Sequence, residues 1–168
     1  MTYNLLALSD VHLGSDLVQH TRPDASRCPA GSLRRDGDLA ALIEWYRERR
    51  IGGHPWRLVI GGDFIDFTGM SVMAEGEASQ TTTAFTPEEL AHGLGGAADH
   101  AIAKLRLVMS QHAPVMHALS AFLRAGNQLV MVPGNHDADW HWEAVQAEFK
   151  HALSSAGGLG PAEIEFSS

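Results

Sequence analysis

The stretch "VMVPGNHDAD", residues 130–139, joins a short apolar run to a cluster of polar side chains. The apolar residues 129–132 predict a buried strand, and the Pro-Gly pair that follows predicts a turn. Asn135, His136 and Asp137 are therefore expected at the carboxyl end of a strand, where open α/β sheets place their ligands. Their chemistry depends on the partners that other strands supply.

Two further predicted strands also end in polar side chains. Residues 3–8 lead to Asp10 and His12, and residues 57–60 lead through two glycines to Asp63. Alternate residues of a strand point to the same side, so Asp10 and His12 can face one point. Taken singly, these residues fit turns, caps or surface histidines. Three such clusters on neighbouring parallel strands instead predict a metal site, whose oxygen and nitrogen donors suit Mn, Fe, Zn or Mg.

The remaining patterning predicts an α/β fold, because strands and helices alternate along the chain. The short, mostly apolar strands are typical of strands covered on both faces. We expect one domain over residues 1–168. The expected helices cover 38–50, 98–125 and 140–153, and a fourth strand is expected at 164–166.

Several boundaries are predicted from local signals. Residues 14–37 are expected to form a long loop, with Asp36 or Asp38 as the cap of the helix that follows. Pro114 is expected to kink or split the helix at 98–125. An insertion is expected at about 67–97, with a short helix that begins at Thr86-Pro87. This insertion is either a lid that contacts substrate or a surface insertion.

Composition excludes several classes of protein. The 168 residues carry a net charge of −8, which disfavours nonspecific nucleic-acid binding. No apolar run is long enough for a transmembrane helix, and the first residues do not predict a signal peptide. A single cysteine, Cys28, fits a reducing compartment, so a cytoplasmic location is expected. The oligomeric state stays open.

The order Asp-x-His, Gly-Asp-x-x-Asp, Gly-Asn-His-Asp resembles the calcineurin-like metallophosphoesterase superfamily, from Tyr3 to about Phe149. The resemblance implies a β-sandwich flanked by helices, with two divalent metal ions at the strand ends. Mn is the expected metal, with Fe, Zn or Mg as alternatives. It further implies that Asp10 and His12 bind the first metal, that Asp63 bridges both metals, and that Asn135 binds the second.

The resemblance also implies the catalytic groups. His136 would contact the phosphate and protonate the leaving oxygen, and Asp137 would orient His136. Asp66 would lie beside the ligands rather than among them. Two cations a few ångströms apart would clamp the phosphoryl oxygens and activate a water, and an imidazole can donate a proton near neutral pH.

One part of the family pattern does not occur in the sequence. The pattern continues with another histidine and a Gly-His-x-His pair, whereas the later histidines here are His141 and His151, expected on a helix surface. We therefore expect the amino-terminal part of a longer protein, which lacks the carboxyl-terminal portion of the sheet. A degenerate homologue and a site completed by a partner are the alternatives. The chain itself is expected to bind Mn²⁺ or Zn²⁺ weakly and to hydrolyse phosphodiesters slowly.

The predicted reaction is hydrolysis of a phosphoester or pyrophosphate bond in a phosphorylated small molecule or lipid-linked nucleotide. The segments "ADWHWEAVQAEFKHAL" and "AEIEF" are similar to bacterial phosphoesterases of the UDP-2,3-diacylglucosamine diphosphatase type. A DNA-processing nuclease of the same superfamily is a second enzyme hypothesis. A noncatalytic binding protein with this fold is a third, because the later histidines are absent. Protein phosphatases fit less well, since Phe67-Thr68 stands where they have Arg-Gly.

Overall fold

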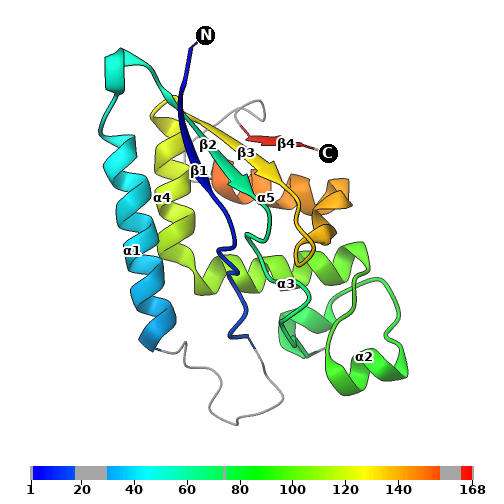
Figure 1. Ribbon diagram of the computed structural model, residues 1–168. Coiled ribbons are helices and arrows are strands. Elements are labelled where there is room, and N and C mark those ends of the chain that lie inside the picture. Colours follow the sequence, from blue (N-terminus) through cyan, green and yellow to red (C-terminus); the bar gives the residue numbers. More distant parts are fainter. Residues whose placement is uncertain (1, 18–29, 74, 156–163, 168) are drawn as a thin grey trace.

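The computed structural model describes residues 2–17, 30–73, 75–155 and 164–167, and it is built around a parallel sheet (Figure 1). The strands pair in parallel in chain order. They are β1 (Asn4–Leu8), β2 (Trp56–Gly61), β3 (Gln128–Val132) and β4 (Ile164–Phe166). The predicted α/β class and the predicted fourth strand are both confirmed. Because all strands run the same way, their carboxyl ends lie at one edge of the sheet.

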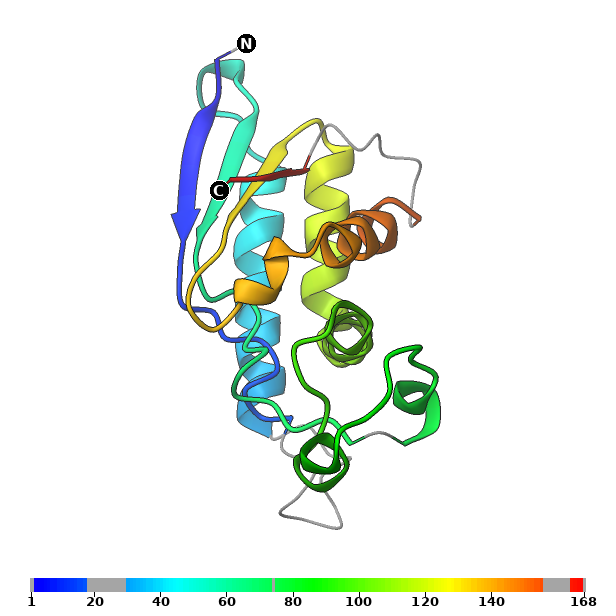
Figure 2. The ribbon, with the colours of Figure 1, turned by 90° about the vertical axis from the view of Figure 1, so that its right-hand side faces the viewer.

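The long helices lie on one side of this sheet (Figure 2). They are α1 (Ala30–Arg47), α3 (Ala98–Gln111), α4 (Ala113–Arg124) and α5 (Glu143–Ser155). The strand residues that face them are at most 1% exposed: Leu58, Ile60, Leu129 and Met131. Burial of this apolar face stabilises the sheet against the helical layer. In the described part of the chain, no helix is long and apolar enough to cross a membrane.

The opposite face of the sheet corrects one expectation. The strands were expected to be covered on both faces, but Leu5 on β1 is 68% exposed and Ala7 is also exposed. Among the described residues, α1, α4 and α5 all pack on the other side (Figure 2). The apolar residues on this face of the strands predicted that it would also be covered. The described helices lie against the other face and leave it exposed.

The first helix is longer than predicted. It begins at Ala30, so the loop expected over 14–37 is wrong for its last eight residues. Asp36 and Asp38 lie inside α1 and cap nothing; Asp36 is buried, whereas Asp38 is exposed. The helix ends at Arg47, and the short 3-10 helix η1 (Ile51–Gly53) contains the glycines that were expected after its end.

The predicted break at Pro114 is confirmed. α3 ends at Gln111 and α4 begins at Ala113, with His112 between them and Pro114 in the first turn of α4. Proline is tolerated there because the first amides of a helix have no intrahelical acceptor. The helix expected at 140–153 starts differently, with the 3-10 helix η3 (Ala138–His141) followed by α5. His141 therefore lies on η3 and His151 on α5, both exposed as predicted.

The segment expected to be an insertion contains the 3-10 helix η2 (Gly76–Ser79) and the short helix α2 (Pro87–His92). The predicted start of α2 is confirmed, because the Thr86 hydroxyl accepts from the Glu89 amide and the Glu89 carboxylate accepts from Thr86. Such reciprocal bonds satisfy two amides that a helix start leaves open.

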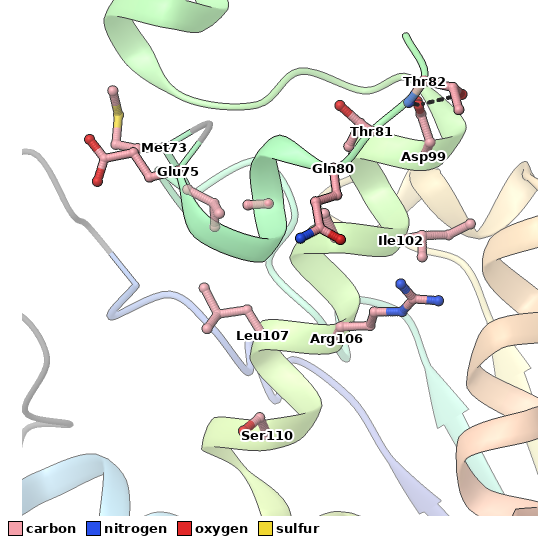
Figure 3. Close-up of a pocket in the computed structure, with 13 residues that line it drawn as sticks. Met73, Glu75, Gln80, Thr81, Thr82, Asp99, Ile102, Arg106, Leu107 and Ser110 are labelled. Atoms are coloured by element: carbon pink, nitrogen blue, oxygen red, sulfur yellow. Dashed lines mark hydrogen bonds between the residues drawn. The ribbon is translucent and has the colours of Figure 1, made fainter.

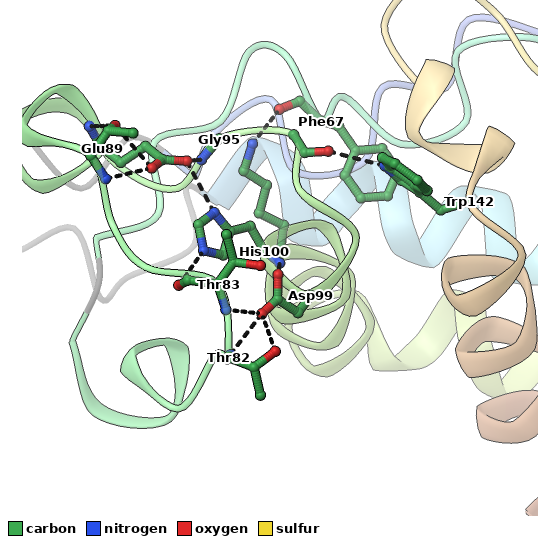
Figure 4. Close-up of polar contacts among 11 residues, drawn as sticks. Phe67, Thr82, Thr83, Glu89, Gly95, Asp99, His100 and Trp142 are labelled. Atoms are coloured by element: carbon green, nitrogen blue, oxygen red, sulfur yellow. Dashed lines mark hydrogen bonds and ion pairs between the residues drawn. The ribbon is translucent and has the colours of Figure 1, made fainter.

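Asp99, at the start of α3, ties this segment to the helical layer (Figure 4). Its Oδ2 accepts from the amides of Thr82 and Thr83, each at 2.7 Å, and from the Thr82 hydroxyl at 3.0 Å. Burial is the largest influence and raises the pKa of Asp99. The hydrogen bonds from both threonines outweigh it and hold that pKa well below its ordinary value of 3.8.

Asp99→Asn should lower the free energy of unfolding at pH 7 by about 1 kcal/mol, the usual net value of a hydrogen bond. A carboxyl whose pKa is lowered on folding stabilises the folded state above its unfolded pKa and loses that effect as the pH falls. The difference between wild type and variant should therefore shrink below pH 3.8. Urea unfolding at pH 7 and pH 3 measures it, with the exposed Asp38→Asn as control. An unchanged difference at both pH values would contradict the prediction.

Candidate metal centre

Three loops leave the carboxyl ends of β1, β2 and β3 and meet at one edge of the sheet. We call residues 9–14 the first loop, residues 62–68 the second loop and residues 133–137 the third loop. β2 pairs with both β1 and β3, so the second loop emerges between the other two. The three clusters predicted from the sequence are thus brought to the same place.

The first and second loops continue the parallel ladder beyond the strands. The His12 amide donates to the Asp63 carbonyl at 2.9 Å, and the Asp66 amide donates to the Leu13 carbonyl at 2.9 Å. A parallel bridge joins Leu13 to Ile65, and both side chains are buried. The polar side chains of these loops are therefore fixed by backbone bonds and by an apolar anchor beneath them.

The second and third loops approach each other through a glycine. A Cβ atom on Gly134 would lie 2.2 Å from Asp63 Oδ1, and one on Gly62 would lie 3.3 Å from Gly134 Cα. The absence of a side chain at Gly134 leaves room for the Asp63 carboxylate, whose Oδ1 accepts from the His136 amide at 2.8 Å. Asp63 thus connects the two loops.

Asp10, His12 and Asp63 form a cluster of potential metal ligands. One ligand atom from each lies within 4.8 Å of the others. Two ligands at about 2.0–2.5 Å from the same cation lie at most about 5 Å apart, so the spacing fits one cation. Two carboxylates and an imidazole also suit a hard or borderline divalent metal. The carboxylate oxygens of Asp10 and Asp63 are therefore close enough to bind the same cation.

The backbone at these residues is unusual. In the part of the chain that the structure describes, three non-glycine residues have positive φ, and they are Asp10 (53°), His12 (52°) and Asp63 (53°). The left-handed region costs a non-glycine residue on the order of 1–3 kcal/mol, and such residues gather at active sites. The left-handed backbone therefore falls on the same three residues that form the ligand cluster. Asp and His adopt this conformation more readily than most non-glycine residues.

His136 lies at the rim of this cluster with Asp66 as its partner. His136 Nδ1 is 2.9 Å from Asp66 Oδ1 and also 2.9 Å from the Thr68 hydroxyl. Asp66 Oδ1 further accepts from the Gly69 amide at 2.7 Å. Ligand atoms of His12, Asp66 and His136 likewise lie within 4.8 Å of one another.

The contact between His136 and Asp66 shifts the pKa of both side chains. The hydrogen bond to Asp66 is the largest influence on His136 and raises its pKa, although desolvation acts in the opposite direction. For Asp66, burial is the largest influence and favours the neutral form. The hydrogen bonds from His136 and the Gly69 amide outweigh it and lower the pKa. The pair therefore favours a protonated imidazole beside an ionised carboxylate.

Asp137 does not orient His136 in this structure, which corrects that expectation. Asp137 is fully buried, and its Oδ2 accepts from the Phe64 amide at 2.8 Å and from the Trp140 indole at 3.0 Å. Its Oδ1 accepts from the Gly134 amide at 2.5 Å. Asp137 therefore holds the second and third loops together, and the carboxylate that contacts His136 belongs to Asp66.

Asn135 is placed by its neighbours in the third loop. It is exposed, and it lies between Gly134 and His136, both of which donate backbone bonds to carboxylates of the site.

Two supporting groups were not predicted from the sequence. The Thr68 hydroxyl contacts His136, and the buried Lys104 donates to the Phe67 carbonyl at 3.2 Å, which fixes the chain directly after Asp66. Burial lowers the pKa of Lys104.

A cavity of about 1060 Å³ lies away from the ligand cluster, between α3 and residues 72–73 and 75–82. Its lining includes Met73, Arg106 and Leu107 (Figure 3). A smaller cavity of about 220 Å³ is lined by His12. The donor set and the left-handed backbone, rather than a cavity, mark the strand ends as the candidate metal centre.

Comparison with known families agrees with this geometry. The family model for calcineurin-like phosphoesterase matches residues 3–160. The chain belongs to the calcineurin-like phosphoesterase family. No curated protein and no solved structure matches it significantly. Family membership assigns the chain to metal-dependent phosphoester hydrolases as a class, while the similarity to UDP-2,3-diacylglucosamine diphosphatases stays a prediction.

Proposed function

We propose that this calcineurin-like phosphoesterase hydrolyses phosphoester or pyrophosphate bonds with two divalent cations at the carboxyl ends of β1, β2 and β3. The observation that carries the proposal is the convergence of Asp10, His12 and Asp63, all with left-handed backbone, at one edge of the sheet. Strained residues with metal-binding side chains are hard to explain by packing alone, because strain costs free energy that another role must justify.

The proposed ligand roles follow from position. Asp10 and His12 would hold the first cation from the first loop, and Asn135 would contribute its amide oxygen to the second cation. Asp63 would offer its carboxylate to both cations, because it lies between the first and third loops and contacts a residue of each. When bound, such cations would polarise the phosphoryl group and lower the pKa of a water. The proposed metal is Mn²⁺, with Fe, Zn or Mg as alternatives.

We assign the proton donor to His136 and its orientation to Asp66. The His136 side chain is 39% exposed, so it can reach a leaving oxygen, whereas Asp66 is buried behind it. The raised pKa of His136 keeps its imidazole protonated to higher pH than that of a free histidine, as a general acid requires. The proposed substrate is a phosphorylated small molecule or a lipid-linked nucleotide, and the proposed location is cytoplasmic.

The test is a titration with Mn²⁺ that follows nitrophenol release from bis-nitrophenyl phosphate. We expect release that depends on Mn²⁺ and is slow, because four protein ligands leave much of the coordination of two cations to water. The matched control is Asp38→Asn, which should leave the rate unchanged. Metal binding without any release would favour the noncatalytic binding protein, and release equal in the presence of chelator would contradict a metal-dependent site. Single-stranded DNA as a parallel substrate tests the nuclease hypothesis.

A further inference from the structure

His112 occupies the joint between α3 and α4. Its amide donates to the Val108 carbonyl at 2.8 Å and ends α3, and its carbonyl accepts from the Val115 amide at 3.0 Å and begins α4. Pro114 produces this break because it cannot donate within a continuous helix. The side chain at the joint is only 3% exposed, so its ring nitrogens must find partners inside the protein.

Both ring nitrogens of His112 have partners. Nδ1 lies 2.9 and 2.8 Å from the two carboxylate oxygens of Asp36 on α1, itself 3% exposed. Nε2 lies 3.2 Å from the Gly14 amide, which donates to it. An amide can only donate, so Nε2 must be unprotonated and Nδ1 must carry the proton. Asp36 thus fixes the neutral tautomer that accepts from Gly14.

Gly14 ends the first loop, two residues after His12. Its φ is +90°, and a Cβ atom there would lie 2.8 Å from Val108 Cγ2 and 2.9 Å from Met70 Cε. The backbone therefore approaches the helical layer closely, and the bond to His112 fixes where it stops. The cavity of about 220 Å³ is lined by His12 as well as by Asp36 and His112, so the pair adjoins the proposed ligand.

We propose that His112, held in one tautomer by Asp36, is a positioning residue that sets the first loop for metal binding by Asp10 and His12. The inference rests on the proposed function. The first loop is held on one side by the second loop, through the bond from the His12 amide to Asp63. On the other side it is held by the bond from Gly14 to His112. Ligands with left-handed backbone need such a support, because their own conformational preference opposes the geometry.

The experiment compares His112→Phe, His112→Gln and the double variant Asp36→Asn/His112→Phe. Phenylalanine keeps the ring shape but removes the acceptor, and glutamine can still accept from Gly14. The double variant removes the unpaired buried carboxylate and so guards against simple unfolding. His117→Gln, at an exposed position of α4, is the matched control. Mn²⁺ affinity by calorimetry and ring ¹⁵N spectra of His112 are the measurements.

We expect His112→Phe and the double variant to lose roughly 10- to 100-fold in Mn²⁺ affinity while remaining folded, and His112→Gln to lose less than about tenfold. The spectra of the metal-free wild type should show the proton on Nδ1. Folded variants with wild-type affinity, or a proton on Nε2, would overturn the proposal.

If the wild type binds no Mn²⁺, the proposed function is wrong. The positioning role of His112 is then tested by hydrogen exchange. In that case the amides of His12 and Gly14 decide. His112→Phe should speed hydrogen exchange at both amides, and His112→Gln should restore their protection. Faster exchange at Gly14 alone would show that His112 bonds to Gly14 without fixing the position of His12. This result would overturn the positioning role.

Discussion

His136→Ala should lower turnover by about 10²- to 10⁴-fold, the usual contribution of a general acid, while Mn²⁺ binding stays near that of the wild type. The imidazole contacts Asp66 through Nδ1 at 2.9 Å and is 39% exposed at the rim of the ligand cluster. These contacts support the proposed role of His136 as a proton donor rather than a role in stabilising the fold. Steady-state kinetics and metal content of the same preparation measure both quantities, with the exposed His151→Ala as control.

Loss of metal in His136→Ala would contradict this role and make His136 a ligand, as its place in the group with His12 and Asp66 allows. Asp66→Asn separates the two roles further. Asp66 raises the pKa of His136, so its replacement should let the acid deprotonate at lower pH. The fall in activity at alkaline pH should then begin at lower pH than in the wild type.

Sequence patterns predicted the strand ends well. Apolar runs followed by glycine or polar residues specified β1, β2 and β3, because a strand that leaves a buried sheet must turn where its apolar run ends. The capping box at Thr86 and the break at Pro114 were also predictable, since each depends on local backbone chemistry. The parallel pairing of these strands brings the Asp10, Asp63 and Asn135 clusters to one edge of the sheet.

The start of α1 was not predictable in the same way. Residues 30–37 contain two glycines and charged side chains, which favour a loop by local propensity. In the structure α1 packs against α4, and tertiary packing stabilises a helix that propensity alone does not. Asp36 is thereby carried to His112, a partner 76 residues away that no local pattern indicates.

Local sequence patterns also could not predict which acidic side chain contacts His136. Asp137 follows His136 directly, which favoured it as the orienting acid, yet the chain turns so that Asp137 faces backbone amides. Asp66 reaches His136 from 70 residues away through the neighbouring loop. The positive φ at Asp10 is equally hidden, because left-handed backbone is normally signalled by glycine.

Asp63→Asn should lower Mn²⁺ affinity by at least about 100-fold, more than the loss of a group that only supports a ligand. Asp63 is the proposed bridge, and its carboxylate supplies charge that a neutral amide does not. Asparagine is the suitable replacement, because it tolerates the left-handed backbone that Asp63 adopts at φ 53°. It can also still accept from the His136 amide. The fold around the site should therefore persist while the charge is removed.

Thermal unfolding with and without Mn²⁺ distinguishes this outcome from misfolding. A ligand that binds only the folded state stabilises it by RT ln(1 + [L]/Kd), so the wild type should show a rise in Tm with Mn²⁺. Asp63→Asn should unfold cooperatively without metal and show no such rise, whereas Asp38→Asn should behave as the wild type. A full rise in Asp63→Asn would mean that the cations are held without the charge of Asp63, and the bridging role would then be wrong.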